Sequence, residues 1–180
     1  LYRNIIGKCF IIISMRGVCC MKKVKEILNH IFIDGLSGMA LGLFATLIVG
    51  TIITQAGSLI GGIAGHYLVI FGKLAQALTG AGIGVGVAYK YKESPLVTIS
   101  AAVAGLVGAF ASKIIAGTVL VDGVITLAGP GEPLGAFIAA FVAVTCGHIV
   151  SGKTKIDILI TPVTTILTGS IVGIIVGPPI

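Results

Sequence analysis

Long stretches of the chain carry no Asp, Glu, Lys or Arg, and they set its hydropathy pattern. These stretches are residues 35–72, 94–112, 133–152 and 158–180. An apolar run of roughly 18–25 residues can cross the ~30 Å hydrocarbon core of a bilayer as a helix. Because several such runs follow one another, we predict an all-α, polytopic integral membrane protein.

The apolar runs predict about five transmembrane helices. We place them at residues 36–54, at a crossing that ends near residue 89, and at residues 95–117, 134–150 and 158–177. Residues 55–89 would form a helix of roughly 50 Å, which is too long for one crossing. Their glycine-rich segments predict a loop or re-entrant piece, so one span is broken or re-entrant. These glycines either line a pathway or let helices pack closely.

The N-terminal residues differ from the rest of the chain. Residues 1–20 hold an apolar run too short to span a membrane, and we interpret them as a non-native or mis-assigned extension before a natural start at Met21. Residues 21–34 place apolar side chains at helical spacing, with lysines mostly elsewhere, which predicts a cationic amphipathic helix at the membrane surface. Residues 35–180 form the predicted transmembrane domain.

The distribution of lysines predicts the orientation. If each span crosses once, one side of the membrane receives Lys22, Lys23, Lys25, Lys90, Lys92, Lys153 and Lys155. Lys and Arg concentrate on the cytoplasmic side of membrane proteins, so the N-terminus is predicted to be cytoplasmic. Lys73 and Lys113 lie within or at the edge of spans, where they either snorkel to an interface or face a polar cavity.

Small residues recur every four positions within the predicted spans. The rows are Gly38/Gly42, Gly80/Gly84, Gly135/Ala139/Ala143/Gly147 and Gly169/Gly173/Gly177. Such a row gives a helix a flat stripe for close backbone approach in lipid. We therefore expect these glycines to lie at helix–helix contacts.

Residues 147–154, "GHIVSGKT", match the P-loop pattern that cradles nucleotide phosphates. A working P-loop follows a buried strand and opens a helix of an α/β sheet, whereas this copy runs on into another apolar span that contains Pro162. We interpret the match as the end of a packing stripe followed by a cytoplasmic turn. Nucleotide binding remains a hypothesis that loss of ATP or GTP binding in Lys153→Ala would support.

Few side chains are candidates for chemistry. The four cysteines form no C-x-x-C pair, and His30, His66 and His148 are scattered, so neither a metal site, a cofactor nor a catalytic residue is predicted. The net charge is +6, but the basic residues lie between apolar runs and aromatic residues do not interleave with them, so no nucleic-acid partner is expected.

A solute-binding site is expected where backbone groups are freed near polar side chains. In "GPGEPLGAF", Gly131 and Glu132 open the fourth span, where a carboxylate and free N–H groups can bind sugar hydroxyls. Alternatively, Glu132 supplies a favourable negative charge at the helix N-terminus. Gln55, Gly82 and Gly84 are further substrate-binding candidates.

Several segments in order resemble the membrane (IIC) subunits of the bacterial phosphoenolpyruvate-dependent sugar phosphotransferase system. They are "FIDGLSGMALGLFATLIVGTIITQAG", "GAGIGVGVAYKYKESPLV", "GPGEPLGAFIAAFVAV" and "VSGKTKIDILITPVTTILTGSIVGIIVGPPI". The resemblance is to the N-terminal half of a compact, stand-alone EIIC branch and covers about residues 22–180. Family members are roughly twice this length, so we expect the permease domain at 35–180 to be truncated at its C-terminus.

The resemblance implies a sugar permease of the bacterial inner membrane, coupled to phosphorylation by a cytoplasmic IIB-type phosphocarrier. The chain would be at most the transport component of that complex. The expected partners are membrane lipid, a sugar or other small polar solute, the IIB partner and further copies of the chain. A carrier or exporter outside the phosphotransferase system is the alternative.

Overall fold

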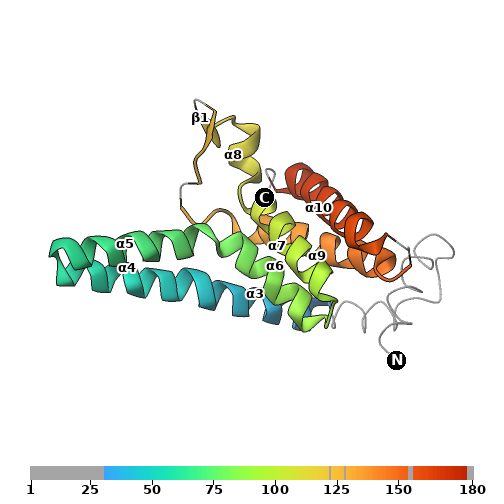
Figure 1. The fold of residues 1–180 in the computed structure, drawn as a ribbon, viewed down its shortest axis with the longest axis horizontal. Helices are drawn as coiled ribbons and strands as arrows, with labels where there is room; N and C mark the ends of the chain where they lie inside the picture. The colour runs from blue at the N-terminus through green and yellow to red at the C-terminus, as the bar shows by residue number, and fades with distance from the viewer. Residues whose placement is uncertain (1–30, 122, 128, 154–155, 178–180) are drawn as a thin grey trace.

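The computed structural model describes residues 31–121, 123–127, 129–153 and 156–177, and these are mostly helical (Figure 1). The helical elements are the π-helical segments η1 (Ile31–Gly35) and η2 (Phe44–Ile48), α3 (Leu36–Leu43), α4 (Val49–Ile60), α5 (Gly62–Ala77), α6 (Thr79–Lys90), α7 (Pro95–Ala109), α8 (Ala111–Ile115), α9 (Pro133–Val150) and α10 (Asp157–Val176). Two-residue strands β1 (Leu120–Val121) and β2 (Val124–Ile125) pair antiparallel between α8 and α9. The predicted all-α class is confirmed.

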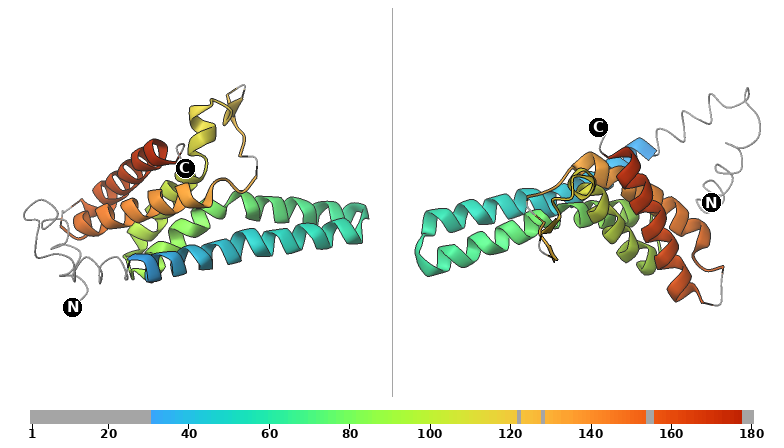
Figure 2. Two further views of the ribbon diagram at one scale, coloured as in Figure 1. Left: turned by 180° about the vertical axis from the view of Figure 1, so that it is seen from behind. Right: turned by 90° about the horizontal axis from the view of Figure 1, so that it is seen from above.

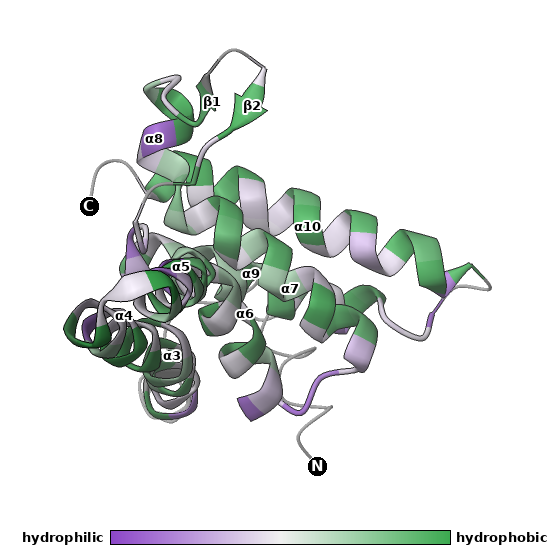
Figure 3. Cartoon of the chain, turned by 60° about the vertical axis from the view of Figure 1, so that its left-hand side comes forward, coloured by the Kyte–Doolittle hydropathy of each residue, from purple (hydrophilic) through white to green (hydrophobic). Residues whose placement is uncertain are grey.

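Several of these helices can cross a bilayer. Within the described residues, three are long and apolar enough: Ile33–Ile60, Pro133–Val150 and Asp157–Val176. The pair α5 and α6 adds a fourth if its path, bent by 52°, is one span, and α7 is a shorter apolar helix. Many large apolar side chains are exposed, and Figure 3 shows that hydrophobic residues make up most of the helices, so lipid is the environment that suits this surface. The multi-pass prediction is confirmed.

Two predicted N-terminal features fall largely outside the structure. The extension at residues 1–20 and residues 21–30 of the amphipathic helix lie outside the described residues. The remaining part, 31–34, belongs to η1 and continues directly into α3.

The predicted break in the second span is present as the 52° bend between α5 and α6, but no loop begins near Gln55. α4 continues to Ile60, and the chain reverses within Gly61 and Gly62, which have φ values of 65° and 64°. These two residues supply the left-handed backbone that a tight helical turn needs. The other glycines of this region stay helical because close contact with the facing helix, not chain reversal, is their role.

Glycines lie along the contact between two antiparallel helical segments, one from η1 to α4 and the other from α5 to α6, which together form a long hairpin. Figures 1 and 2 show η1, α3, η2 and α4 running beside α5 and α6, with the α4–α5 part reaching beyond the other helices. A Cβ added at Gly38 would lie 2.6 Å from the carbonyl oxygen of Gly86, and one at Gly57 would lie 2.8 Å from that of Gly65. Backbones this close leave no room for side chains.

α6 also packs against α7 and α9, and these three helices form a bundle with α10. Its buried core consists largely of small and β-branched side chains, with Phe110 as the largest of those that are fully buried. A Cβ at Gly108 would lie 2.6 Å from the Gly135 carbonyl oxygen, and a Cβ at Gly169 would lie 2.6 Å from the Ala143 Cβ. The small-residue rows expected at helix contacts are therefore confirmed.

The third predicted span is shorter than expected. We predicted residues 95–117, whereas α7 ends at Ala109 and the chain bends at Phe110 before the short α8. The chain returns to the end of α7 at Gly131, where there is no space for a side chain. The Glu132 N–H donates to the Ala109 carbonyl oxygen at 2.7 Å, which ties the residues before α9 to the end of α7.

Two ends of the bundle can be distinguished. Lys90, Lys92 and Lys153 lie at one end, because the connection after α6 meets the end of α9 through a 3.3 Å contact between the Ser94 and Ser151 hydroxyls. We call this the basic end. The opposite end holds α8, the β1–β2 hairpin and the start of α9 (Figure 1).

Candidate functional site

The connection between α6 and α7 contains a lysine whose backbone lies in the left-handed region. Lys92 has φ 53°, whereas every other positive φ among the described residues belongs to glycine. The Lys92 N–H donates to the Tyr89 carbonyl oxygen (3.0 Å), and the Glu93 N–H donates to that of Ala88 (3.1 Å). These bonds satisfy carbonyls at the end of α6 and turn the chain back toward α9.

Ser94 begins the next helix. Its extended backbone precedes Pro95 at the first helical position, and its hydroxyl accepts a 3.4 Å bond from the Val97 N–H. Serine before proline is a strong helix start, because the hydroxyl satisfies a free N–H and proline fixes a helical φ. The helix start thus fixes the position of the preceding residue, Glu93.

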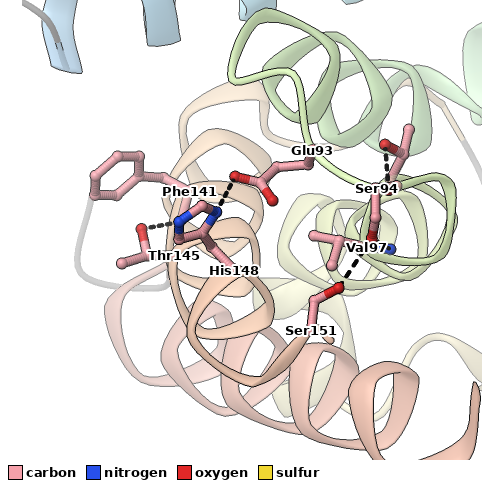
Figure 4. A network of polar contacts seen from close by, with 8 residues as sticks. Glu93, Ser94, Val97, Phe141, Thr145, His148 and Ser151 are labelled. Atoms are coloured by element: carbon pink, nitrogen blue, oxygen red, sulfur yellow. Dashed lines mark hydrogen bonds and ion pairs between the residues drawn. The ribbon is translucent and has the colours of Figure 1, made fainter. Parts of the chain in front are cut away.

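Glu93 and His148 form a partly buried polar pair. The Glu93 Oε1 and His148 Nδ1 atoms are 2.8 Å apart, and the side chains are 5% and 18% exposed. Figure 4 shows the carboxylate from the α6–α7 connection pointing at the imidazole on α9. Burial raises the pKa of Glu93, and the charge and hydrogen bond of His148 partly offset that rise. The pair can therefore share a proton and hydrogen-bond a hydroxyl-bearing ligand.

An open pocket adjoins this pair. It has a volume of about 530 Å³ and is lined by Tyr89, Lys90, Lys92, Glu93 and Thr98. The lining combines two ammonium groups, a carboxylate and two hydroxyls, so it suits a polar or charged ligand.

Gly131 and Glu132 lie at the opposite end. Gly131 has φ 73°, and a Cβ there would also lie 2.7 Å from the Ala109 carbonyl oxygen. The Glu132 carboxylate accepts a 2.7 Å bond from the Ser112 hydroxyl of α8 and is exposed. Glu132 precedes Pro133 without capping α9 through its side chain.

The other predicted binding residues lie apart from Glu132. Gln55 is exposed on α4, in the part of the hairpin that reaches beyond the bundle. A Cβ at Gly82 would lie 2.7 Å from the Thr46 methyl, and Gly84 lies against the Ala101 carbonyl oxygen. Gly131 and Glu132 are adjacent in the sequence, and the structure brings none of Gln55, Gly82 and Gly84 into one site with them.

The P-loop-like segment has no strand–loop–helix context. Residues 147–150 complete α9, and a Cβ at Gly147 would lie 2.6 Å from the Thr165 Oγ1 atom. Gly152, with φ 76°, turns the chain, and Lys153 is exposed. Gly147 is a packing residue, as the stripe predicted. Within the described part of the chain, no three His, Cys, Asp or Glu side chains are grouped to hold a metal ion.

Sequence reasoning missed Glu93. In the sequence, His148 is one of three scattered histidines, and Glu93 belongs to no recognised motif. A signal was present, since the predicted topology places both residues at the same end of an otherwise charge-poor domain. Their contact depends on the turn at Lys92, which no pattern indicated.

The fold defines a polytopic α-helical membrane protein with a polar cluster at one end. A family model described as "Phosphotransferase system, EIIC" matches residues 33–180, so the chain belongs to that family and is a sugar permease component of the phosphotransferase system. No curated protein and no solved structure matches the chain.

Proposed function

We propose that the protein carries a sugar across the bacterial inner membrane and presents it, still bound, for phosphorylation by a cytoplasmic IIB-type phosphocarrier. The family match over residues 33–180 carries this proposal. The lysines at the basic end support a cytoplasmic location for that end, and hence a cytoplasmic N-terminus. Further copies of the chain are expected partners, since the hairpin leaves much apolar surface uncovered.

The Glu93–His148 pair is our candidate for the group that handles the sugar hydroxyl. A neutral imidazole that donates from Nδ1 to the carboxylate presents Nε2 as an acceptor. As the hydroxyl oxygen forms its bond to phosphorus, the bond between phosphorus and the partner breaks. The hydroxyl proton passes to His148, and Glu93 stabilises the resulting imidazolium.

Glu132 with Gly131 is a second proposed sugar contact, at the opposite end. The exposed carboxylate keeps acceptor capacity beyond its bond to Ser112. Gln55, Gly82 and Gly84 remain weaker proposals, because the two glycines face neighbouring helices. Glu132→Gln should raise the apparent KM for the sugar more than it lowers the maximal rate.

The test uses membrane vesicles from cells that express the full chain, supplied with phosphoenolpyruvate and a cytosolic extract containing phosphocarriers. A panel of radiolabelled hexoses, hexitols and disaccharides is offered, and the phosphorylated product is measured. We expect phosphoenolpyruvate-dependent accumulation of one sugar phosphate. His148→Gln should lower its rate by about 100-fold or more, as loss of a general base does.

The exposed His66 of α5 supplies a matched control, and His66→Gln should retain the rate. Uptake that ignores phosphoenolpyruvate would favour a carrier outside the phosphotransferase system. No transport of any member of the panel would contradict the proposal itself.

A further inference from the structure

Two depressions of opposite character adjoin each other at the basic end. The first is the polar pocket already described, lined by Tyr89, Lys90, Lys92, Glu93 and Thr98, which we call the basic pocket. The second, the apolar groove, has a volume of about 330 Å³ and is lined by Leu41, Gly42, Ala45, Gly82, Val85, Gly86 and Tyr89. Tyr89 lines both depressions, so they meet at this side chain.

The basic pocket favours an anion. Its one carboxylate, Glu93, lies in hydrogen-bond contact with His148 (Figure 4). Lys90 and Lys92 leave a net positive lining, and Thr98 adds a hydroxyl donor. Lysine ammonium groups bind phosphate as point charges.

The choice of residue at position 92 supports a role for its side chain. The left-handed region is sterically unfavourable for an L-residue, and glycine avoids this cost. The chain uses glycine at all seven other positive-φ positions among the described residues: Gly61, Gly62, Gly117, Gly123, Gly129, Gly131 and Gly152. A lysine at this one turn places an ammonium group beside the pocket at the expense of backbone strain.

The apolar groove exists because its floor lacks side chains. Gly42, Gly82 and Gly86 lie where α3 and α6 approach most closely, and the side chains of Leu41 and Val85 flank them. From Gly82 to Tyr89 the groove follows α6 for roughly 10 Å. An open groove with this apolar lining fits a hydrocarbon chain.

We propose that an anionic phospholipid binds here, with its phosphate between Lys90 and Lys92 and one acyl chain in the apolar groove. Tyr89 would lie at the boundary between headgroup and chain, where aromatic side chains with a polar tip are favoured. Basic pockets between membrane helices on the cytoplasmic side recognise anionic headgroups. The continuity of a positive pocket with an apolar groove favours this occupant over a free anion or a helix of a second copy, each of which would use only one half.

The experiment measures the melting temperature of the full chain, purified in detergent and supplied with phosphatidylglycerol or phosphatidylcholine. We expect phosphatidylglycerol to raise it by about 5 °C or more at saturation, and phosphatidylcholine to raise it much less. The double variant Lys90→Gln with Lys92→Gln should lose most of this difference. Lys153→Gln removes an exposed lysine at the same end and should keep it.

Two further variants separate the halves of the site. Ala45→Phe fills the apolar groove and should reduce the shift, whereas Ala40→Phe, exposed on α3 outside the groove, should not. Lys92→Gly suits the left-handed turn, so it should fold at least as well as wild type while losing part of the shift.

Three outcomes would overturn the proposal. They are equal shifts with both lipids, an equal loss in Lys153→Gln, and a full shift with inorganic phosphate or glycerol phosphate alone. The last would reveal a site for a free phosphate instead of a lipid.

Discussion

Glu93 is a partly buried titratable residue at the basic end. It lies in the α6–α7 connection, outside the spanning helices, and burial raises its pKa above the usual 4.5 despite the opposing effect of His148. A carboxyl with a raised folded-state pKa stabilises the folded state at low pH. That contribution is lost as pH rises through the folded-state value.

Glu93→Gln should therefore gain stability relative to wild type as pH increases. Gln stays neutral and can still accept the bond from His148, so the folded state no longer bears the cost of a buried charge. The measurement is the difference in melting temperature between variant and wild type from about pH 4 to about pH 8. A difference that stays flat or decreases with pH would contradict this account.

Lys92 offers a test of backbone strain that does not depend on its charge. Lys92→Gly and Lys92→Ala both remove the ammonium group, but only glycine adopts φ 53° without steric cost. We expect the glycine variant to be more stable by about 1 kcal/mol. Equilibrium unfolding of the two purified variants measures this, and equal stability would show that the turn relaxes.

At the scale of elements, glycine decides how closely helices approach. A Cβ at Gly42 would meet the Gly82 carbonyl oxygen and would lie 2.6 Å from the Ile83 nitrogen, and both are backbone atoms that cannot rotate away. Gly42→Ala should therefore push α3 from α6 and destabilise the protein by about 1–3 kcal/mol. Unfolding in increasing SDS checks this, with Ala40→Leu, exposed on the same helix, as the control. Equal unfolding midpoints would contradict it.

How far the sequence predicts these elements depends on how local their causes are. Charge-free runs predict α9 and α10 almost residue by residue. Small residues at a spacing of four predict the close helix contacts at Gly135 and Gly169, because this signal repeats along one helix. Whether Gly61 turns the chain while Gly57 stays helical depends on the facing helix. The Glu93–His148 pair likewise needs α6 and α9 to meet, which a single sequence does not specify.

At the scale of the whole molecule, the distribution of lysines predicts the orientation. The structure places Lys90, Lys92 and Lys153 at one end, while the opposite end carries the β1–β2 hairpin, Glu132 and Lys113 of α8. Retaining Lys and Arg on the cytoplasmic side is the strongest general determinant of membrane topology. We therefore expect the basic end to face the cytoplasm.

Two single-cysteine variants, made in a chain whose native cysteines are replaced by serine, test this orientation. Thr126→Cys is exposed near β2, and Lys153→Cys is exposed after α9. In intact cells with a permeabilised outer membrane, a membrane-impermeant maleimide should label only Thr126→Cys, and both should react after lysis. Labelling of only Lys153→Cys in intact cells would invert the topology. It would also place Glu93, His148 and the basic pocket on the side where no cytoplasmic phosphocarrier can reach them.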